Sequence, residues 1–199
     1  MSWFSRTPLE GVRWAVVDCE TSGLDAARER LLAVGAVSVR AGRIELAGAY
    51  SALVRQAHPS DRANIVLHGI GGEAQTGGRA LEEVRGELGR FMDGAVPVAF
   101  HAPFDAEVLR RHGVRPAKPW LDLAQLAPAL FPAEAALHRA LDDWLRRFDI
   151  APAARHDALG DAYAAAQLLL ALLSEARRQG ATTLERVFAA AKQARWLPR

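Results

Sequence analysis

Apolar and β-branched residues dominate three stretches near the start of the chain, and the lengths of these stretches are typical of strands. They are residues 14–18, 32–39 and 44–54. Gly42 sits in a short Arg-Ala-Gly-Arg turn between the second and third stretches, which predicts an antiparallel hairpin. Residues 71–78 hold four glycines but lack the Lys-Ser/Thr pair of a phosphate-binding loop. We interpret that segment as a flexible connection.

From residue 81 onward, apolar positions recur at the spacing of helices. This spacing predicts helices over residues 81–91, 103–112, 137–148 and 157–178. Two further helices are expected, one behind Asp122 as N-cap and one at the end of the chain, where Thr182 and Glu185 form a capping-box pattern. Short strands are expected at residues 97–100 and 119–121. The order of these elements predicts a mixed α/β sheet with helices on its faces.

The composition is that of an ordinary globular protein, with 50% hydrophobic and 24% charged residues in a chain of 199. A net charge of +2 is too small to indicate nucleic-acid binding by itself, and a single cysteine excludes an internal disulfide framework. The first residues lack the apolar run of a signal peptide, and the most apolar stretch, residues 162–173, is too short to cross a membrane. We therefore expect a cytoplasmic protein without a membrane partner.

Two carboxylates follow each other at the end of the first predicted strand. Side chains alternate along a strand, so Asp18 and Glu20 point to one face and Cys19 to the other. Neighbouring carboxylates repel each other unless a cation lies between them, and Mg²⁺ or Mn²⁺ prefers such oxygen ligands. An isolated Asp-x-Glu is also compatible with two solvated acids. With Thr21 and Gly23 added, four fixed residues would have to match a motif by chance, so two solvated acids become a much less favoured explanation.

Two more segments carry candidate chemistry. Asp105 lies in the first turn of a predicted helix, a place that acids also favour because of the helix dipole. His156 precedes the long helix, and Asp161 lies in its second turn. A histidine there can take a proton from water near neutral pH, although a lone histidine before a helix is more often a solvated side chain or a helix cap.

In this order, the three segments resemble the DEDDh exonuclease superfamily, which includes the epsilon proofreading subunit of DNA polymerase III, RNase T and oligoribonuclease. The resemblance spans about residues 12–175. The residues that match the family motifs are Asp18, Glu20, Thr21, Ser22 and Gly23 in the first, Phe104 and Asp105 in the second, and His156, Ala158, Leu159, Asp161 and Ala162 in the third. The sister DEDDy class carries tyrosine four residues before the last aspartate, where this chain has Asp157.

The resemblance implies a ribonuclease H-like α/β fold, with a five-stranded mixed sheet flanked by helices and an extra C-terminal helix. Residues 1–178 would form the exonuclease domain and residues 179–199 a helical extension of it. Two Mg²⁺ or Mn²⁺ ions would be held by Asp18, Glu20, Asp105 and Asp161, with His156 as general base. The implied reaction is 3′→5′ hydrolysis of DNA or RNA to nucleoside 5′-monophosphates, and the resemblance favours a DNA polymerase III epsilon-like enzyme.

The resemblance also suggests how the terminal 3′ nucleotide is bound. The candidate substrate-binding residues are Thr21, Leu24, His68, Ile70 and His101. For Leu24 and Ile70, packing in the core is the alternative. His101 replaces the asparagine usual in the family, either keeping a polar contact at the rim of the site or being merely tolerated. After His68 and Ile70 the family's Thr-Asp/Glu pattern is replaced by Gly-Gly-Glu, which leaves the order of this loop open.

A different class of function remains possible, an accessory or nucleic-acid-binding module in which docking matters more than catalysis. Residues 125–131 faintly resemble a sliding-clamp-binding peptide, but their sequence is more typical of an ordinary helix and loop. The expected partners are single-stranded or 3′-end nucleic acid and, more remotely, a DNA polymerase or sliding clamp. The sequence leaves the choice between DNA and RNA open.

Overall fold

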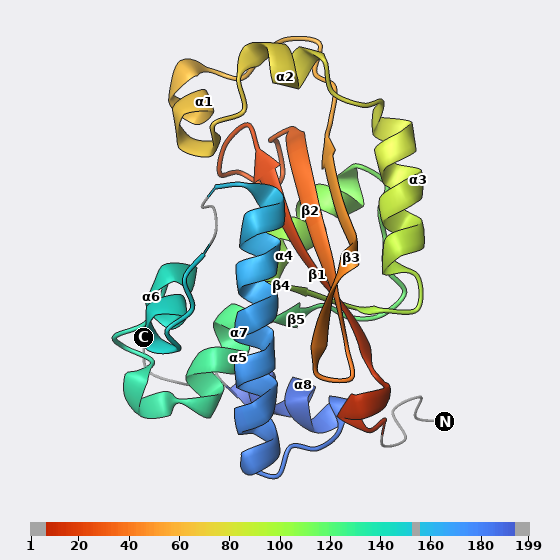
Figure 1. Cartoon of the computed structure of the whole chain (residues 1–199). Helices are drawn as coiled ribbons and strands as arrows, with labels where there is room; N and C mark the ends of the chain where they lie inside the picture. The colour runs from red at the N-terminus through yellow and green to blue at the C-terminus, as the bar shows by residue number, and fades with distance from the viewer. Residues whose placement is uncertain (1–6, 153–155, 194–199) are drawn as a thin grey trace.

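The computed structural model describes residues 7–152 and 156–193 of the chain (Figure 1). Over these residues, five strands form one mixed sheet in the order β3-β2-β1-β4-β5. The first three strands along the chain pair antiparallel, whereas β4 and β5 extend the sheet in parallel with β1. The strands are β1 (Arg13–Thr21), β2 (Leu31–Arg40), β3 (Arg43–Leu53), β4 (Val96–Ala99) and β5 (Leu121–Asp122). The expected five-stranded mixed sheet and its hairpin are confirmed.

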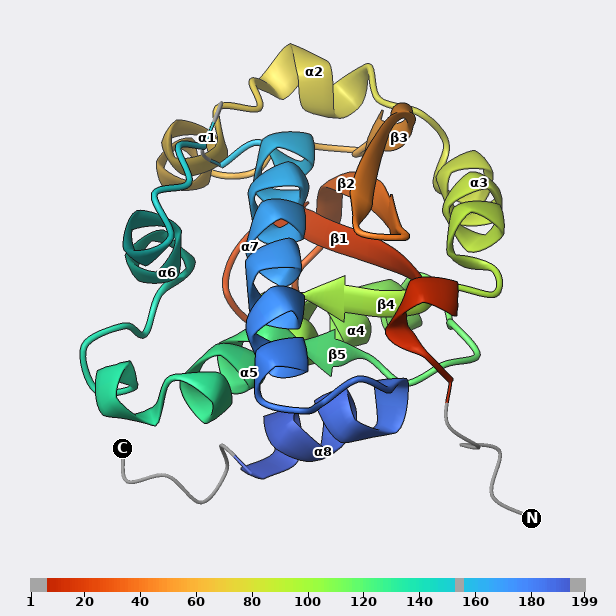
Figure 2. The same ribbon diagram turned by 60° about the horizontal axis from the view of Figure 1, so that its bottom comes forward.

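Helices cover both faces of the sheet, as Figures 1 and 2 show. One face carries α7 (Ala158–Arg178), with α5 (Leu123–Leu130), α6 (Leu141–Arg147) and α8 (Leu184–Gln193) in the same core. The other face is covered by α3 (Leu81–Met92) and α4 (Ala102–Arg111). Two short helices, α1 (Arg62–His68) and α2 (Gly72–Thr76), lie beyond one end of the sheet. The 3-10 turns are η1 (Leu9–Gly11) and η2 (Pro132–Glu134).

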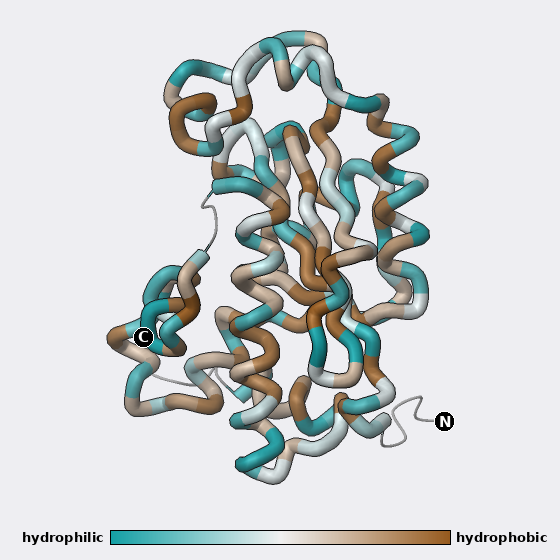
Figure 3. The backbone as a smooth tube through the Cα atoms, viewed as in Figure 1, coloured by the Kyte–Doolittle hydropathy of each residue, from teal (hydrophilic) through white to brown (hydrophobic). Residues whose placement is uncertain are grey.

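Strand β1 divides the interior into two cores because its side chains alternate between the faces. Trp14 and Val16 pack with α5, α7 and α8, while Ala15, Val17 and Cys19 pack with α3 and α4. Figure 3 shows hydrophobic residues along the central strands and along α7, whose buried side chains belong to the core on its side of the sheet. By the same alternation Asp18 continues the α7 side of the strand, so the end of β1 presents a carboxylate to the start of α7.

Gly35 lets the start of α7 approach the sheet closely. It lies on β2 directly opposite Asp18 in the antiparallel register. A Cβ added at Gly35 would come within 2.3 Å of the backbone of Ala158 and Leu159, far closer than any real contact. The absence of a side chain at this position therefore sets how near the first turn of α7 comes to the end of β1.

Two expectations about local structure were wrong. The glycine-rich segment at residues 71–78 is not merely a flexible connection, because it contains α2. There the fully buried Gln75 side chain donates to the Ile70 carbonyl (2.8 Å) and the Ser60 hydroxyl (2.9 Å), and it accepts from the Ser60 N–H (2.7 Å). These hydrogen bonds hold the segment in place. The glycine content of the segment gives no indication of them.

The predicted helix over residues 137–148 is too long. Leu137 is 74% exposed, and α6 begins only at Leu141. The Asp143 carboxylate accepts from the backbone N–H groups of Arg139 (3.0 Å) and Ala140 (2.9 Å), which caps the helix and fixes its start. A local cap thus overrides the apolar periodicity.

Other expectations were confirmed. Asp122 caps α5 by accepting from the Ala124 N–H (3.0 Å). The segment that faintly resembles a clamp-binding peptide is part of α5 and the residue after it, and Leu126, Ala127 and Leu130 are buried in the core. It is the ordinary helix and loop that its sequence favoured. None of the helices in the described part of the chain has the length and apolar character needed to cross a bilayer.

Candidate active site

The end of β1 and the start of α7 form the centre of the candidate site. Asp157 caps α7 by accepting from the Gly160 N–H (2.7 Å), and this fixes where the helix begins. The buried Asp161 in the first turns then faces the strand, and its Oδ2 accepts from the backbone N–H of His156 (3.0 Å). His156 itself is exposed and adopts a left-handed backbone conformation with φ of 58°. Such conformations are costly for non-glycine residues and are enriched at functional sites.

Three of the predicted site residues come together in space. Glu20, His156 and Asp161 each offer one ligand atom, and these atoms lie within 4.8 Å of one another. Within the described part of the chain, these residues bring together two carboxylates and one imidazole, from a strand end, a loop and a helix. Oxygen ligands of this kind suit a hard divalent cation, and the imidazole suits several divalent metals. The set can hold a metal ion.

Asp18 and Asp105 lie close by but outside that group of three. Asp105 is buried on α4. Its neighbour is Cys19, which lies on the face of β1 opposite to that of Asp18. Burial raises the pKa of the Cys19 thiol well above its ordinary value, and the negative charges of Asp105, Asp18 and Glu20 raise it further. All three carboxylates therefore act on the same buried thiol, which places them around one strand end.

Asp105 is an acid in an environment that disfavours its charge. Burial raises its pKa from 3.8 to about 7, although hydrogen bonds from the Cys19 thiol and from backbone N–H groups offset part of the effect. A cation near this carboxylate would relieve the cost of ionising it. The chemistry of this buried acid therefore fits a metal site.

The raised pKa predicts an effect on stability. In metal-free protein, the folded state pays no penalty at Asp105 below pH 4, and it loses stability as pH rises toward and through 7. Asp105→Asn removes this loss, so its free energy of unfolding relative to wild type should improve by up to roughly 4 kcal/mol between pH 4 and pH 8, at 1.36 kcal/mol per pKa unit. Denaturant titrations in excess chelator measure this difference. An identical pH dependence of the free energy of unfolding in both proteins would show that the pKa of Asp105 is not raised by folding.

A cleft of about 430 Å³ opens beside the site. It is lined by Cys19, Glu20, Thr21, Ser22, Gly23, Leu24, Asp61, Ala63, Asn64, Leu67, His68, Phe104 and His156. Its walls are the end of β1 with the loop that follows, α1, and the start of α4. Leu24 is 89% exposed, so packing in the core is excluded for it. The Thr21 hydroxyl donates to the Gly23 carbonyl (2.6 Å), which shapes the loop at the bottom of the cleft.

His68 lines the cleft, but both of its ring nitrogens are engaged within the protein. Nδ1 accepts from the Ile70 N–H (2.9 Å), so Nε2 carries the proton and donates to Asn64 Oδ1 (2.6 Å). The Asn64 amide in turn donates to the Thr21 carbonyl (3.1 Å). Burial lowers the pKa of His68, in keeping with the neutral ring that this chain of bonds requires. His68 thereby ties α1 to the end of β1.

Two of the predicted substrate-binding residues lie outside this cleft. Ile70 is partly buried after α1, where its backbone contacts His68 and Gln75. His101 is exposed in a left-handed conformation (φ of 64°) just before α4, and its N–H donates to Asp122 Oδ1 (3.0 Å). Asparagine and histidine both tolerate this conformation better than most residues. The backbone geometry explains why histidine is accepted where the family usually has asparagine.

Sequence reasoning missed Asn64 and Asp61. Asp61 caps α1 by accepting from the Asn64 N–H (2.8 Å), and Asn64 connects that helix to Thr21. The only sequence signal was the i, i+4 spacing of Asn64 and His68, which places both on one side of a helix. Because α1 has only seven residues, that signal was too short to stand out.

Comparisons with known proteins agree with the motifs. The Exonuclease family model, of the RNase T type, matches residues 15–169. The DNA polymerase III subunit epsilon-like protein of Rhodobacter capsulatus is 34% identical over 189 residues, which cover 92% of this chain and 27% of that protein. The DNA polymerase III PolC-type protein of Thermotoga petrophila is 28% identical over 184 residues, covering 90% of this chain and 13% of that protein. The chain spans only a minor part of the length of both relatives.

Solved structures share the fold. Exonuclease X in complex with 5′-overhanging duplex DNA superposes with a TM-score of 0.71 at 23% identity, covering 89% of this chain and 99% of that one. Exonuclease I of E. coli with a dT13 oligonucleotide gives a TM-score of 0.72 at 14% identity, covering 84% and 42%. The expected ribonuclease H-like fold is thereby confirmed. With its family match and its three motifs in order, the chain belongs to the RNase T family of exonucleases, the DEDDh class of phosphodiester hydrolases.

Proposed function

We propose that this chain is a metal-dependent 3′→5′ exonuclease that releases nucleoside 5′-monophosphates from a nucleic-acid end. The observation that carries the proposal is the convergence of Glu20, at the end of β1, with His156 and Asp161, at the start of α7, at one side of an open cleft. Two carboxylates and an imidazole within 4.8 Å supply metal ligands and a base in the same place. An ordinary surface cluster of acids does not need a cleft of nucleotide size beside it.

We assign the metal ligands to Asp18, Glu20, Asp105 and Asp161. Two Mg²⁺ or Mn²⁺ ions bound there would neutralise charge on the scissile phosphate and make the attacking water more acidic. The raised pKa of Asp105 supports this assignment, since a cation bound beside this buried acid would favour its ionised form. The protein contributes the fixed placement of the carboxylates, through β1 on one side and the starts of α4 and α7 on the other.

The role we assign to His156 is proton removal from the attacking water. Its side chain is exposed at the cleft, and its backbone is anchored to Asp161, so the ring can turn toward the site while its attachment point stays fixed. The terminal nucleotide would occupy the cleft, whose volume of about 430 Å³ suits a ligand of that size. Leu24 and Thr21 would contact its sugar and base.

Replacing His156 with alanine is expected to reduce kcat by roughly 10²–10⁴-fold at neutral pH, the usual value of a general base. Mg²⁺ or Mn²⁺ affinity should change little, because the proposed ligands are the four acids. Raising the pH should partly restore activity, since hydroxide becomes more abundant. The exposed His58→Ala serves as control. Turnover near that of wild type at pH 7, or loss of metal binding, would rule out this role.

The substrate class and partners are also proposals. The epsilon-like and PolC-type relatives carry the names of polymerase proteins, which favours a DNA 3′ end as substrate and proofreading beside a polymerase as a second candidate role. Digestion of labelled single-stranded DNA, of duplex DNA with a mismatched 3′ end and of RNA separates the substrate classes. Co-purification with a polymerase or sliding clamp, together with weak activity on all three substrates, would favour docking as the main function.

We propose a single domain, with residues 1–178 as its exonuclease part and residues 179–199 as an extension. Helix α8 supports this for the described part of the extension, because Leu184, Val187 and Ala191 are buried in the core shared by α5 and α7. An isolated bridge between Pro8 and Thr183 also joins the two ends of the described chain. The last six residues lie outside the described part.

A further inference from the structure

The loop after β1 forms one wall of the cleft and has little buried surface of its own. We call residues 22–30 the rim loop. Its ends are joined by the Ser22 N–H, which donates to the Arg30 carbonyl (3.1 Å), and by the Arg30 N–H, which donates to the Ser22 hydroxyl (2.9 Å). Inside it, the Glu29 N–H donates to the Asp25 carbonyl (2.9 Å). The loop thus has a defined shape, but these bonds do not fix its position against the rest of the molecule.

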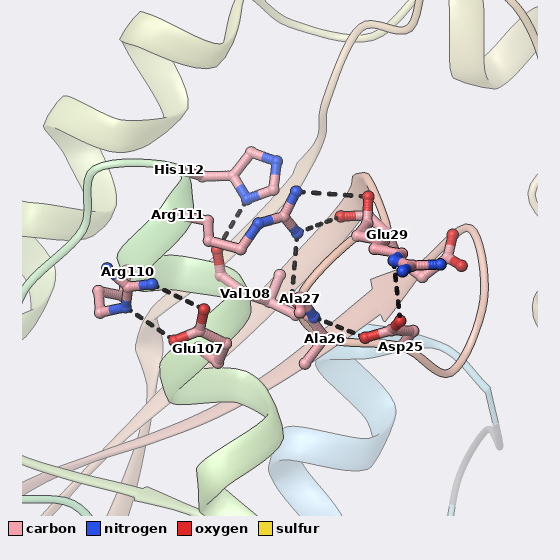
Figure 4. Close-up of polar contacts among 10 residues, drawn as sticks. Asp25, Ala26, Ala27, Glu29, Glu107, Val108, Arg110, Arg111 and His112 are labelled. Atoms are coloured by element: carbon pink, nitrogen blue, oxygen red, sulfur yellow. Dashed lines mark hydrogen bonds and ion pairs between the residues drawn. The ribbon is translucent and has the colours of Figure 1, made fainter.

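Arg111, at the end of α4, supplies such an attachment. Its Nη1 donates to the carbonyls of Glu29 (2.8 Å) and Ala26 (3.0 Å), and its Nη2 donates to the carbonyl of Arg28 (3.3 Å). Figure 4 shows the guanidinium group directed at the loop, whereas the neighbouring Arg110 turns away to pair with Glu107. A planar guanidinium presents five N–H donors in a rigid fork, whereas a lysine ammonium is a compact charge with three donors on a flexible stem.

The position of Arg111 links the rim loop to the catalytic centre. Helix α4 also carries Asp105, so one rigid element holds a proposed metal ligand near its start and the rim loop at its end. On the other side of the loop, Arg30 donates to the His58 carbonyl (2.6 Å), in the segment that leads into α1. The three walls of the cleft are therefore connected through the rim loop. Leu24, which is 89% exposed, lies at the free edge of that loop.

We propose that Arg111 is a positioning residue for substrate binding: it holds the rim loop at the distance from α4 at which Leu24 and Ser22 meet the terminal nucleotide. The expected effect of Arg111 on substrate binding rests on the proposed exonuclease function. The attachment of the rim loop by Arg111 does not depend on that function. The Arg111 side chain donates to backbone carbonyls of the rim loop, so its loss is expected to act on substrate binding and to leave the chemical step intact.

The test compares Arg111→Ala with Arg110→Ala, a neighbour of the same type that lacks the loop contacts. In Arg111→Ala, KM for a short single-stranded oligonucleotide is expected to rise on the order of tenfold, because several hydrogen bonds that order the binding surface are lost. kcat at saturating substrate and metal affinity should stay near wild type. The KM of Arg111→Lys should lie between those of Arg111→Ala and wild type, and the KM of Arg110→Ala should resemble that of wild type.

Limited trypsin digestion gives a second readout that needs no activity. Arg28 is an exposed cleavage site within the rim loop, and cleavage after it should be faster in Arg111→Ala than in Arg110→Ala at a temperature where both stay folded. Equal KM and equal cleavage in the two variants would overturn the proposal, as would a fall in kcat with unchanged KM. If the wild-type protein cleaves no nucleic acid, the exonuclease function fails, while the cleavage rates still decide whether Arg111 holds the loop.

Discussion

Asp18→Asn is expected to reduce exonuclease activity to background. Asp18 lies at the end of β1, on the strand face that meets the start of α7, and it is one of the four acids that we propose as metal ligands. Removing its charge would weaken metal binding and remove several kcal/mol of the charge stabilisation that the metal ions would supply at the scissile phosphate. A loss of that size corresponds to roughly 10³-fold or more in rate. Initial rates and metal titration by calorimetry, on the same preparation, measure both effects.

The matched control for this variant is Asp149→Asn. Asp149 is exposed and has a left-handed backbone (φ of 55°) that asparagine tolerates well, so this change should leave activity and metal affinity unaltered. A higher pH should not rescue Asp18→Asn, in contrast to His156→Ala. Substantial activity of Asp18→Asn, with metal affinity like that of wild type, would show that Asp18 is not a ligand.

Gly35→Ala should be almost as damaging, although Gly35 carries no functional group. The added Cβ would lie 2.3 Å from the backbone of Ala158 and Leu159, so the start of α7 must move by about 1 Å to reach an ordinary contact of 3.4 Å. That shift carries Asp161 and His156 away from Glu20. A misplacement of about 1 Å can cost on the order of 10²-fold in rate. Overpacking of this kind also costs about 1–3 kcal/mol of stability.

Gly48→Ala is the control for this steric argument. Gly48 also lies in a strand, β3, but a Cβ added there meets nothing within 4 Å. We expect its melting temperature and activity to match those of wild type. Activity of Gly35→Ala equal to that of Gly48→Ala would mean that α7 can adjust its first turn without disturbing the site.

Much of the fold and the site could be predicted because the relevant signals are local. The alternation of side chains along β1 placed Asp18 and Cys19 on opposite faces, and the two cores of the structure agree with this. Asp122 caps the helix behind it, as its residue type and position predicted. The motif residues could be recognised because their side chains meet only if they keep short, fixed spacings at a strand end and at a helix start.

The missed features depend on contacts between segments distant in sequence. Gln75 orders α2 through bonds to Ser60 and Ile70, and Asn64 ties α1 to Thr21 across more than forty positions of the chain. No periodicity records such pairs. Conversely, Leu137 fits an apolar helical stripe but lies before the cap that starts α6. The geometry of the cleft therefore required the structure, whereas the four candidate metal ligands are proposed from the sequence motifs.

The most direct test of the proposed exonuclease activity follows the products of a defined oligonucleotide. Single-stranded DNA labelled at its 5′ end is incubated with the protein in Mg²⁺, in Mn²⁺ or in excess chelator, with its 3′ end either free or blocked by a bulky group. A metal-dependent 3′→5′ exonuclease should shorten the strand stepwise and release nucleoside 5′-monophosphates when the 3′ end is free and metal is present. It should not react in chelator or with a blocked 3′ end. Full activity in chelator, or internal fragments that precede mononucleotides, would contradict the proposed activity.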